Sequence, residues 1–208
     1  SETRRNYCRR QVKIMMYERR TMVVSSGNYQ TREDGGELYI EGYFAVFNSP
    51  YVIMDGVTEI VAPGAFSDTL GEDIRALTNH DTTLVLGRNK AGTLTLREDS
   101  HGLWGSIRIN QADADAMNLY NRVKRGDVDQ CSFGFIILAE ERRVLENSDV
   151  QYVILKVRLL EVSVVTFPAY EDTSVSARAR QEENIRQRIL AERKEKLREK
   201  LKGATKTC

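Results

Sequence analysis

The chain contains two histidines, and an imidazole has the chemistry of a general base. His80 lies in the stretch Thr-Asn-His-Asp at 78–81, and His101 precedes Gly102 in a polar turn. Imidazole titrates near neutral pH, but it also serves as a purely structural hydrogen-bonding group. His80 ends a buried-looking strand beside a break, from which a side chain can face a cleft, whereas His101 is typical of a solvated loop tip. We therefore take His80 as the candidate base.

Ser132 lies within an aromatic strand, where bulky residues are usual and serine is not. Gly134 leaves the same face of the strand bare, because side chains alternate between the two faces. A small serine beside a bare glycine makes room for another chain's backbone, so close sheet packing explains the pattern and a nucleophile stays an alternative. Cys131 points to the opposite face, so it competes poorly as a nucleophile if His80 lies near Ser132.

Glu161 interrupts a nearly continuous apolar run at 159–165, which is typical of a strand buried on both faces. A buried carboxylate is costly unless it is paired. Its partner is either an Arg, which would give a structural ion pair, or an imidazole that it orients, which would give a catalytic triad. Both interpretations stay open at this point.

Several functional classes are excluded by their missing patterns. The glycines match no phosphate-binding loop, and no Gly-x-Ser-x-Gly elbow of an α/β-hydrolase is present. Asp113 and Asp115 alternate as in calcium loops but lack the remaining ligands. The three cysteines have no zinc or disulfide spacing, which favours a reducing compartment. We therefore predict no cofactor and no metal.

Short strands separated by turns fill the middle of the chain. The predicted strands are 38–47, 57–61, 74–79, 83–87, 92–98, 103–109, 130–138, 150–157 and 159–167. A turn about every ten residues is typical of an antiparallel sandwich or barrel. A short helix is expected at 64–71, and an amphipathic one at 112–123, with Asn110 as its cap and Gly126 at its end.

Charge is distributed unevenly along the 208 residues, although the net charge is only +1. Residues 1–20 carry a net +5 and residues 178–208 a net +6, whereas 21–177 carry −10. Basic arms of this kind either bind nucleic acid or an acidic partner, or are solvated tails. The predicted organisation is a basic N-terminal arm at 1–34, one folded domain at 35–176 and a charged helical or disordered arm at 177–208.

The first residues of the chain do not have the pattern of a secretory signal. The chain starts at Ser1 without Met, which suggests a trimmed or partial chain. Its first basic residues are not followed by an apolar run, so no secretory signal is expected. No stretch approaches the ~18 consecutive apolar residues of a membrane span, so no membrane partner is expected either.

Five segments of the chain form a recognisable series, namely 42–48 (GYFAVFN), 59–66 (EIVAPGAF), 77–81 (LTNHD) with 86–88 (LGR), 131–135 (CSFGF) and 160–170 (LEVSVVTFPAY). Taken in this order, they resemble the HK97-type prohead protease family of tailed bacteriophages. The resemblance covers about 37–177. It implies a fold shared with the herpesvirus assemblins, which makes the prediction a β-rich α+β domain with an antiparallel β-barrel surrounded by a few helices.

The resemblance implies a serine endopeptidase with Ser132 as nucleophile and His80 as base. Glu161, predicted on the second strand after Ser132, is the best placed third member, and Asp81 stays a candidate. Backbone N–H groups near 168–170 are expected to bind the oxyanion.

The same resemblance implies a setting and partners. The enzyme would act in the host cytoplasm, inside the phage procapsid, on extensions of the scaffold or the major capsid protein, and on itself. It would form a homo-oligomer and need no nucleic acid. The alternative is a catalytically silent scaffold or capsid-assembly module, against which an intact Ser132 and His80 argue.

Overall fold

A computed structural model describes residues 20–24, 30–147 and 149–167, and five helical residues of the C-terminal segment. Of residues 23 and 24 only the backbone is described. The strands are β1 (Arg20–Val24), β2 (Gln30–Asp34), β3 (Glu37–Val46), β4 (Tyr51–Met54), β5 (Val57–Val61), β6 (Arg75–Thr78), β7 (Asp81–Arg88), β8 (Leu94–Glu98), β9 (Gly102–Ile109), β10 (Gln130–Val144) and β11 (Val150–Val165). A 3-10 turn, η1 (Asn89–Ala91), and one helix, α1 (Ala114–Arg125), complete the described elements.

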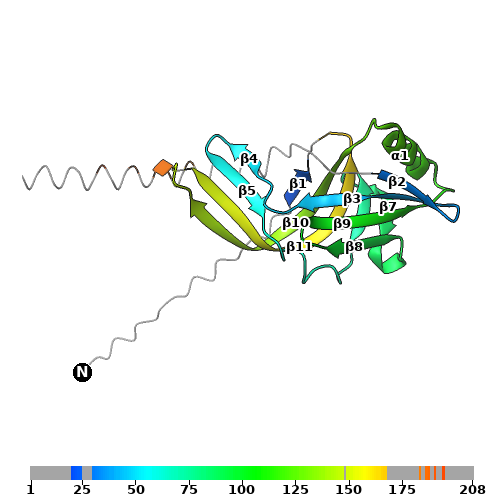
Figure 1. Cartoon of the computed structure of the whole chain (residues 1–208), viewed down its shortest axis with the longest axis horizontal. Helices are drawn as coiled ribbons and strands as arrows, with labels where there is room; N and C mark the ends of the chain where they lie inside the picture. Colours follow the sequence, from blue (N-terminus) through cyan, green and yellow to red (C-terminus); the bar gives the residue numbers. More distant parts are fainter. Residues whose placement is uncertain are drawn as a thin grey trace, which may run out of the picture.

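The strands form two sheets (Figure 1). The larger has the order β1-β10-β11-β5-β4, with β6 also pairing with β11 and β7 pairing with β6. The smaller has the order β2-β3-β9-β8. One hydrophobic core joins them, since Phe44 of β3, Ile107 of β9, Phe133 of β10 and Val162 of β11 are all fully buried in the same cluster. This core holds the strands that carry the candidate residues.

The β-rich prediction is confirmed, but the described strands do not close into a barrel. The helix predicted at 64–71 was wrong, because this stretch is a series of turns with bonds such as Thr69 N–H to the Phe66 carbonyl at 3.0 Å. Gly64 has a φ of +88°, and the Glu98 carboxylate accepts from the backbone N–H of Gly64 and of Phe66. The left-handed backbone of Gly64 and the hydrogen bonds to the Glu98 carboxylate stabilise turns in this segment instead of a helix.

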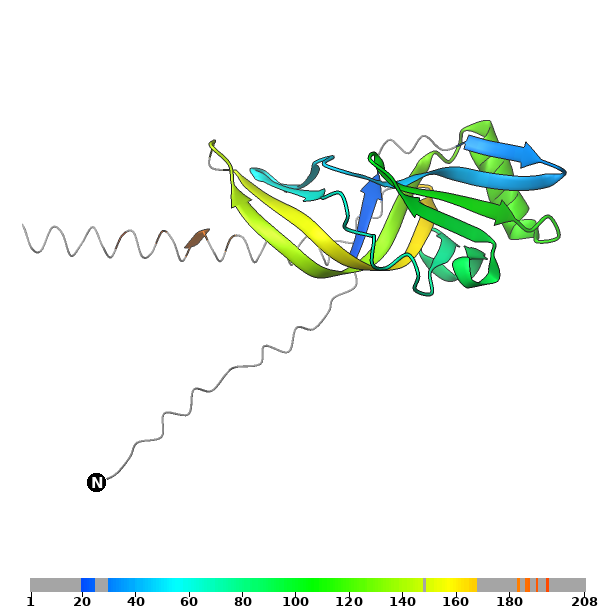
Figure 2. The ribbon, with the colours of Figure 1, turned by 60° about the horizontal axis from the view of Figure 1, so that its bottom comes forward.

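The two strands predicted at 150–157 and 159–167 are one strand, β11. It pairs antiparallel with β10 over its length, and parallel with β5 near its start and β6 near its end. Glu161 therefore lies on the first strand after β10, not the second. Figures 1 and 2 show β10 and β11 running together from the body, beside α1, toward the part of the molecule that carries β4 and β5.

The predicted amphipathic helix is present as α1, with one change at its start. Its cap is Asp113, not Asn110, because the Asp113 carboxylate accepts from the backbone N–H of Asp115 and of Ala116. Gly126 ends the helix as predicted, with a φ of 86°. The residues that α1 buries are Ala116, Leu119, Tyr120 and Val123.

Two strands fall within the stretch expected as an N-terminal arm, since β1 and β2 pair with β10 and β3 respectively. The C-terminal arm lies largely outside the described residues. Its described residues, Glu183, Arg186, Gln187, Leu190 and Lys194, are helical and exposed. No helix within the described part of the chain is long and apolar enough to cross a membrane.

Candidate active site

A two-residue hairpin presents His80 above the strand β11. Asn79 and His80 connect β6 to β7 and have φ values of 51° and 60°, the positive pair that such tight hairpins require. Asn and His tolerate this left-handed region better than most residues. The turn is tied to the end of β11, because Asn79 N–H donates to the Val164 carbonyl and the Thr166 N–H donates to Asn79 Oδ1, both at 2.9 Å. The His80 ring is thus fixed relative to β11.

His80, Glu161 and Ser163 form one hydrogen-bonded group. His80 Nδ1 lies 2.7 Å from Glu161 Oε1, and the Ser163 hydroxyl donates to the other carboxylate oxygen, Oε2, also at 2.7 Å. The same hydroxyl oxygen accepts from the backbone N–H of His80 at 3.2 Å. Because the carboxylate faces Nδ1, that nitrogen is expected to carry the ring proton, which leaves Nε2 as the basic nitrogen.

Gly134 makes the space that the Glu161 carboxylate occupies. The two residues are partners in the β10–β11 register, so their side-chain positions share one face of the sheet. A Cβ atom on residue 134 would overlap Glu161 Oε1. The bare position is therefore filled by a carboxylate, not by another chain's backbone. Glu161 itself is 3% exposed, so its burial depends on hydrogen bonds such as those with His80 and Ser163.

Ser132 lies on the same face of the sheet, opposite Ser163 in the register. Its side chain is fully buried, and its hydroxyl donates to the Met22 carbonyl of β1 at 2.8 Å. His80 Nε2 is buried and has no hydrogen-bond partner among the described residues. In this conformation the serine proton is directed at β1, while the basic nitrogen of His80 is unused.

The other candidates are placed elsewhere by their own hydrogen bonds. Asp81 Oδ1 accepts from the hydroxyl and the backbone N–H of Thr83, and these bonds lower the pKa of the Asp81 carboxyl. Arg75 is the register partner of Glu161 on β6, but its guanidinium bonds to Asp73 at 3.3 Å. Of the two partners considered for Glu161, the structure thus brings the imidazole to it.

Cys131 and His101 lie apart from this group. Cys131 is on the other face of β10, where its thiol donates to the Tyr43 carbonyl at 3.0 Å. The His101 ring packs edge-on against the Tyr43 ring with centroids 4.4 Å apart, in the turn between β8 and β9. Both outcomes follow the predictions made from strand alternation and from the polar turn.

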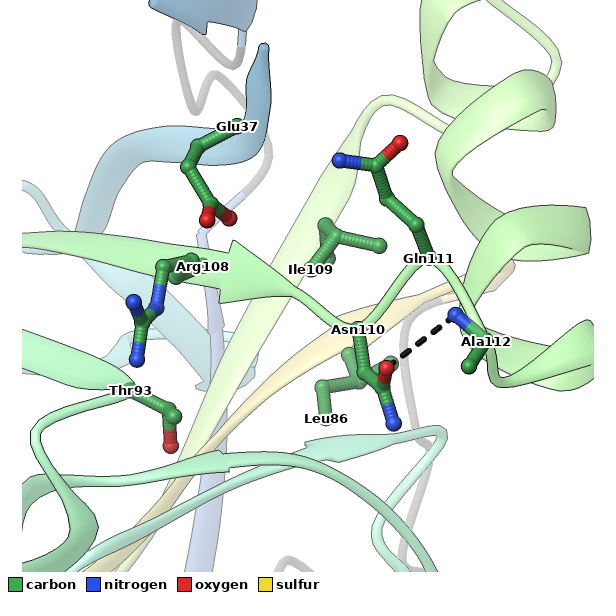
Figure 3. A pocket seen from close by; sticks show the side chains of 8 residues that line it. All are labelled: Glu37, Leu86, Thr93, Arg108, Ile109, Asn110, Gln111 and Ala112. Atoms are coloured by element: carbon green, nitrogen blue, oxygen red, sulfur yellow. Dashed lines mark hydrogen bonds between the residues drawn. The ribbon is translucent and has the colours of Figure 1, made fainter. Parts of the chain in front are cut away.

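A cavity of about 410 Å³ lies at another place in the fold, where β3 begins, β9 ends and the chain turns toward α1. Figure 3 shows Glu37, Arg108 and Gln111 around it, and the hydrogen bond from Ala112 N–H to Asn110. None of the candidate catalytic residues lines this cavity. Within the described chain, no cluster of His, Cys, Asp or Glu is arranged to hold a metal ion. The predicted oxyanion donors near 168–170 lie outside the described residues.

Ser163 and β1 were not predicted from the sequence as parts of the site. Ser163 lies two residues after Glu161 on a strand, so alternation alone places both side chains on one face. That signal was available. The position of β1 was not, because a five-residue strand that pairs with β10, more than a hundred residues later, has no local pattern that identifies its partner.

Comparisons with known proteins identify the family of the chain. The family model described as caudovirus prohead serine protease matches residues 26–188. The prohead protease of Enterobacteria phage HK97 is 30% identical over 148 residues, which are 69% of this chain and 61% of that protein's length. The chain therefore spans less than two thirds of this relative. A solved structure of the bacteriophage T4 capsid assembly protease, gp21, is similar to this chain with a TM-score of 0.45 and 12% sequence identity. The match covers 71% of this chain and 98% of the gp21 chain. Since the family match extends over most of its length, the chain belongs to the caudovirus prohead serine protease family.

Proposed function

We propose that the chain is a serine endopeptidase in which Ser132 is the nucleophile, His80 the general base and Glu161 the residue that orients His80. The observation that carries this proposal is the 2.7 Å contact between His80 Nδ1 and Glu161 Oε1, on the sheet face that also holds Ser132. Membership in the prohead serine protease family supports it independently.

The proposed chemistry is acyl transfer in two steps. His80 Nε2 takes the proton of the Ser132 hydroxyl while Oγ attacks the substrate carbonyl carbon, and the same proton then goes to the leaving amine as the peptide bond breaks. Water hydrolyses the acyl-enzyme, with His80 again as base. The Glu161 carboxylate stabilises the imidazolium that forms in both steps.

A rearrangement at Ser132 must precede attack. The hydroxyl hydrogen bonds to the Met22 carbonyl and the residue has no exposed surface. For catalysis the proton must turn toward Nε2, and a substrate carbonyl must take the place next to Oγ. The first change needs only rotation of the hydroxyl, but the second requires the carbonyl of β1 to leave, so we infer that β1 moves when a substrate binds.

The proposed setting is the phage procapsid, assembled in the host cytoplasm. There the enzyme cleaves extensions of the scaffold or the major capsid protein, and its own chain, and it works as a homo-oligomer. The family name and the printed name of the HK97 relative, a prohead protease, support this setting.

A serine-directed fluorophosphonate tests the enzyme assignment directly. The expected result is one covalent adduct at Ser132, found by peptide mass mapping, with loss of cleavage of a co-expressed scaffold protein. His80→Ala should label far more slowly, because the base is missing. Ser106→Ala is the matched control and should be labelled at Ser132 like the unchanged chain. Ser106 is also a buried serine on a strand, but its hydroxyl bonds to the Glu41 carboxylate in the smaller sheet.

The second candidate function is a catalytically silent assembly module. The complete burial of Ser132 under β1 is the observation that favours it. Absence of labelling at Ser132 in procapsids undergoing maturation, with normal incorporation of the chain, would select this alternative.

A further inference from the structure

β1 adds an antiparallel strand to β10 beside the candidate nucleophile. Val23 is the register partner of Ser132, and the carbonyl that accepts the Ser132 hydroxyl belongs to Met22. The peptide bond next to Ser132 Oγ is therefore the one between Met22 and Val23. β1 ends at Val24, before residue 26, where the family match begins, so it lies outside the matched part of the chain.

The side chains of β1 are held in two different environments. Met22 is buried in the main hydrophobic core. Arg20 donates two hydrogen bonds to Glu59 of β5, Nη1 to Oε2 at 2.9 Å and Nη2 to Oε1 at 3.0 Å. Glu59 is fully buried, and a planar two-bond pairing of this kind is the most selective way for a carboxylate to recognise a guanidinium.

We propose that β1 occupies the position of a substrate strand and that Glu59 selects a basic side chain, preferably Arg, at the third residue before the cleaved bond. The inference rests on the proposed function. Extended peptides that add to a sheet gain affinity from the backbone and specificity from alternate side chains. A substrate strand in the register of β1 would place an apolar residue at the position of Met22 and its basic residue against Glu59.

Peptide pairs test the subsite without changing the enzyme. A fluorogenic peptide containing Arg-Thr-Met-Val-Val, the sequence of β1, is compared with one that carries citrulline in place of Arg, which keeps the shape and removes the charge. The expected cleavage is between Met and Val, with kcat/KM lower by about 10- to 100-fold for the citrulline peptide, the range of charged hydrogen bonds.

Variants of the chain give a second, independent readout. Glu59→Gln should abolish the difference between the two peptides, whereas Glu41→Gln, which alters a buried carboxylate bound by Arg32 in the smaller sheet, should preserve it. Arg20→Gln should raise kcat/KM for the Arg peptide, because β1 competes within the molecule at high effective concentration. Arg32→Gln should leave kcat/KM unchanged. A purely structural Arg20–Glu59 pair predicts the opposite, a slower and less stable Arg20→Gln enzyme.

The outcomes separate this inference from the proposed function. If the Arg and citrulline peptides are cleaved at equal rates and cleavage depends on Ser132, the Glu59 subsite is overturned and the proposed endopeptidase function is not. If Glu59→Gln fails to fold, the peptide comparison on the unchanged enzyme still decides. Cleavage of neither peptide by an enzyme that the fluorophosphonate still labels at Ser132 overturns the subsite alone, whereas cleavage of neither peptide and no labelling at Ser132 contradict the proposed function as well.

Discussion

At the scale of single residues, the proposed base and nucleophile act as a unit. His80→Ala and Ser132→Ala should each lower the rate of scaffold cleavage by about 10⁴- to 10⁶-fold, because removing either member of a triad costs nearly as much as removing all of them. His101→Gln is the matched control and should keep full activity, as should Cys131→Ala. Near-normal cleavage by the His80 variant, measured by gel densitometry of a purified substrate, would identify a different base.

A substitution of Glu161 distinguishes between two roles for its carboxylate, orienting His80 and stabilising the fold. Glu161→Gln should remain folded but lose on the order of 10²- to 10⁴-fold in kcat, since the amide holds the wrong imidazole tautomer. A structural role predicts instead a loss of stability of roughly 3–5 kcal/mol with normal turnover, measured at low temperature where the variant is folded. Circular dichroism melts of Glu161→Gln and of Glu41→Gln, the control for a buried carboxylate, complete the comparison.

The Ser163 hydroxyl links the carboxylate of Glu161 to the backbone of His80, so its removal should loosen both. Ser163→Ala should lower kcat by about 10-fold with little change in KM, the effect of one buried hydrogen bond in the transition state. Ser106→Ala should have no effect on kcat. Because the chain has two histidines, a ¹⁵N-histidine spectrum resolves the His80 ring, and a wild-type tautomer in Ser163→Ala would rule out the positioning role.

At the scale of elements, the β10–β11 register creates the site. Gly134→Ala should abolish activity, because its Cβ displaces the Glu161 carboxylate and with it the contact to His80. Gly71→Ala is the control, since no atom lies within 4 Å of the added Cβ and its φ is not left-handed. An active Gly134→Ala enzyme would mean that Glu161 can orient His80 from another position, which activity assays and thermal melts together would reveal.

Strand patterns made part of the candidate site predictable from the sequence, whereas the pairing between distant strands was not predictable. Alternation correctly placed Ser132 and Cys131 on opposite faces of β10, and the cost of burying a carboxylate correctly predicted that Glu161 has a hydrogen-bonding partner. Which partner Glu161 takes was not predictable from composition, because this depends on the left-handed hairpin at Asn79 and His80. The helix predicted at 64–71 failed because Glu98, which is distant in the sequence, satisfies the backbone of that turn. Local patterns thus identified strands and faces, but not the long-range pairings.

At the scale of the whole molecule, the charged C-terminal arm is expected to be dispensable for chemistry. Sixteen of the residues 178–208 are Lys, Arg or Glu, and every described residue of this arm is exposed, so it contributes little to the core. A chain ending near residue 176 should fold and cleave a supplied scaffold, yet be incorporated poorly into procapsids. Scaffold cleavage in solution and the protease content of purified procapsids measure the two effects, and an unfolded truncation would place the arm inside the domain.

The order in which the strands leave the ribosome follows from the place of β1 in the sheet. β1 is synthesised first of the described strands, but its partner β10 begins more than a hundred residues later, and Glu161 comes later still. Pairings this distant in sequence form slowly, since loop closure must precede them. A nascent chain that has not reached residue 161 lacks the Glu161 carboxylate, and one that has not reached residue 165 lacks the end of β11, to which the hairpin at Asn79 and His80 is bonded. On the proposed function, the catalytic group is therefore expected to assemble only once β11 has been synthesised, so the growing chain and its neighbours on the ribosome would not be cleaved before then.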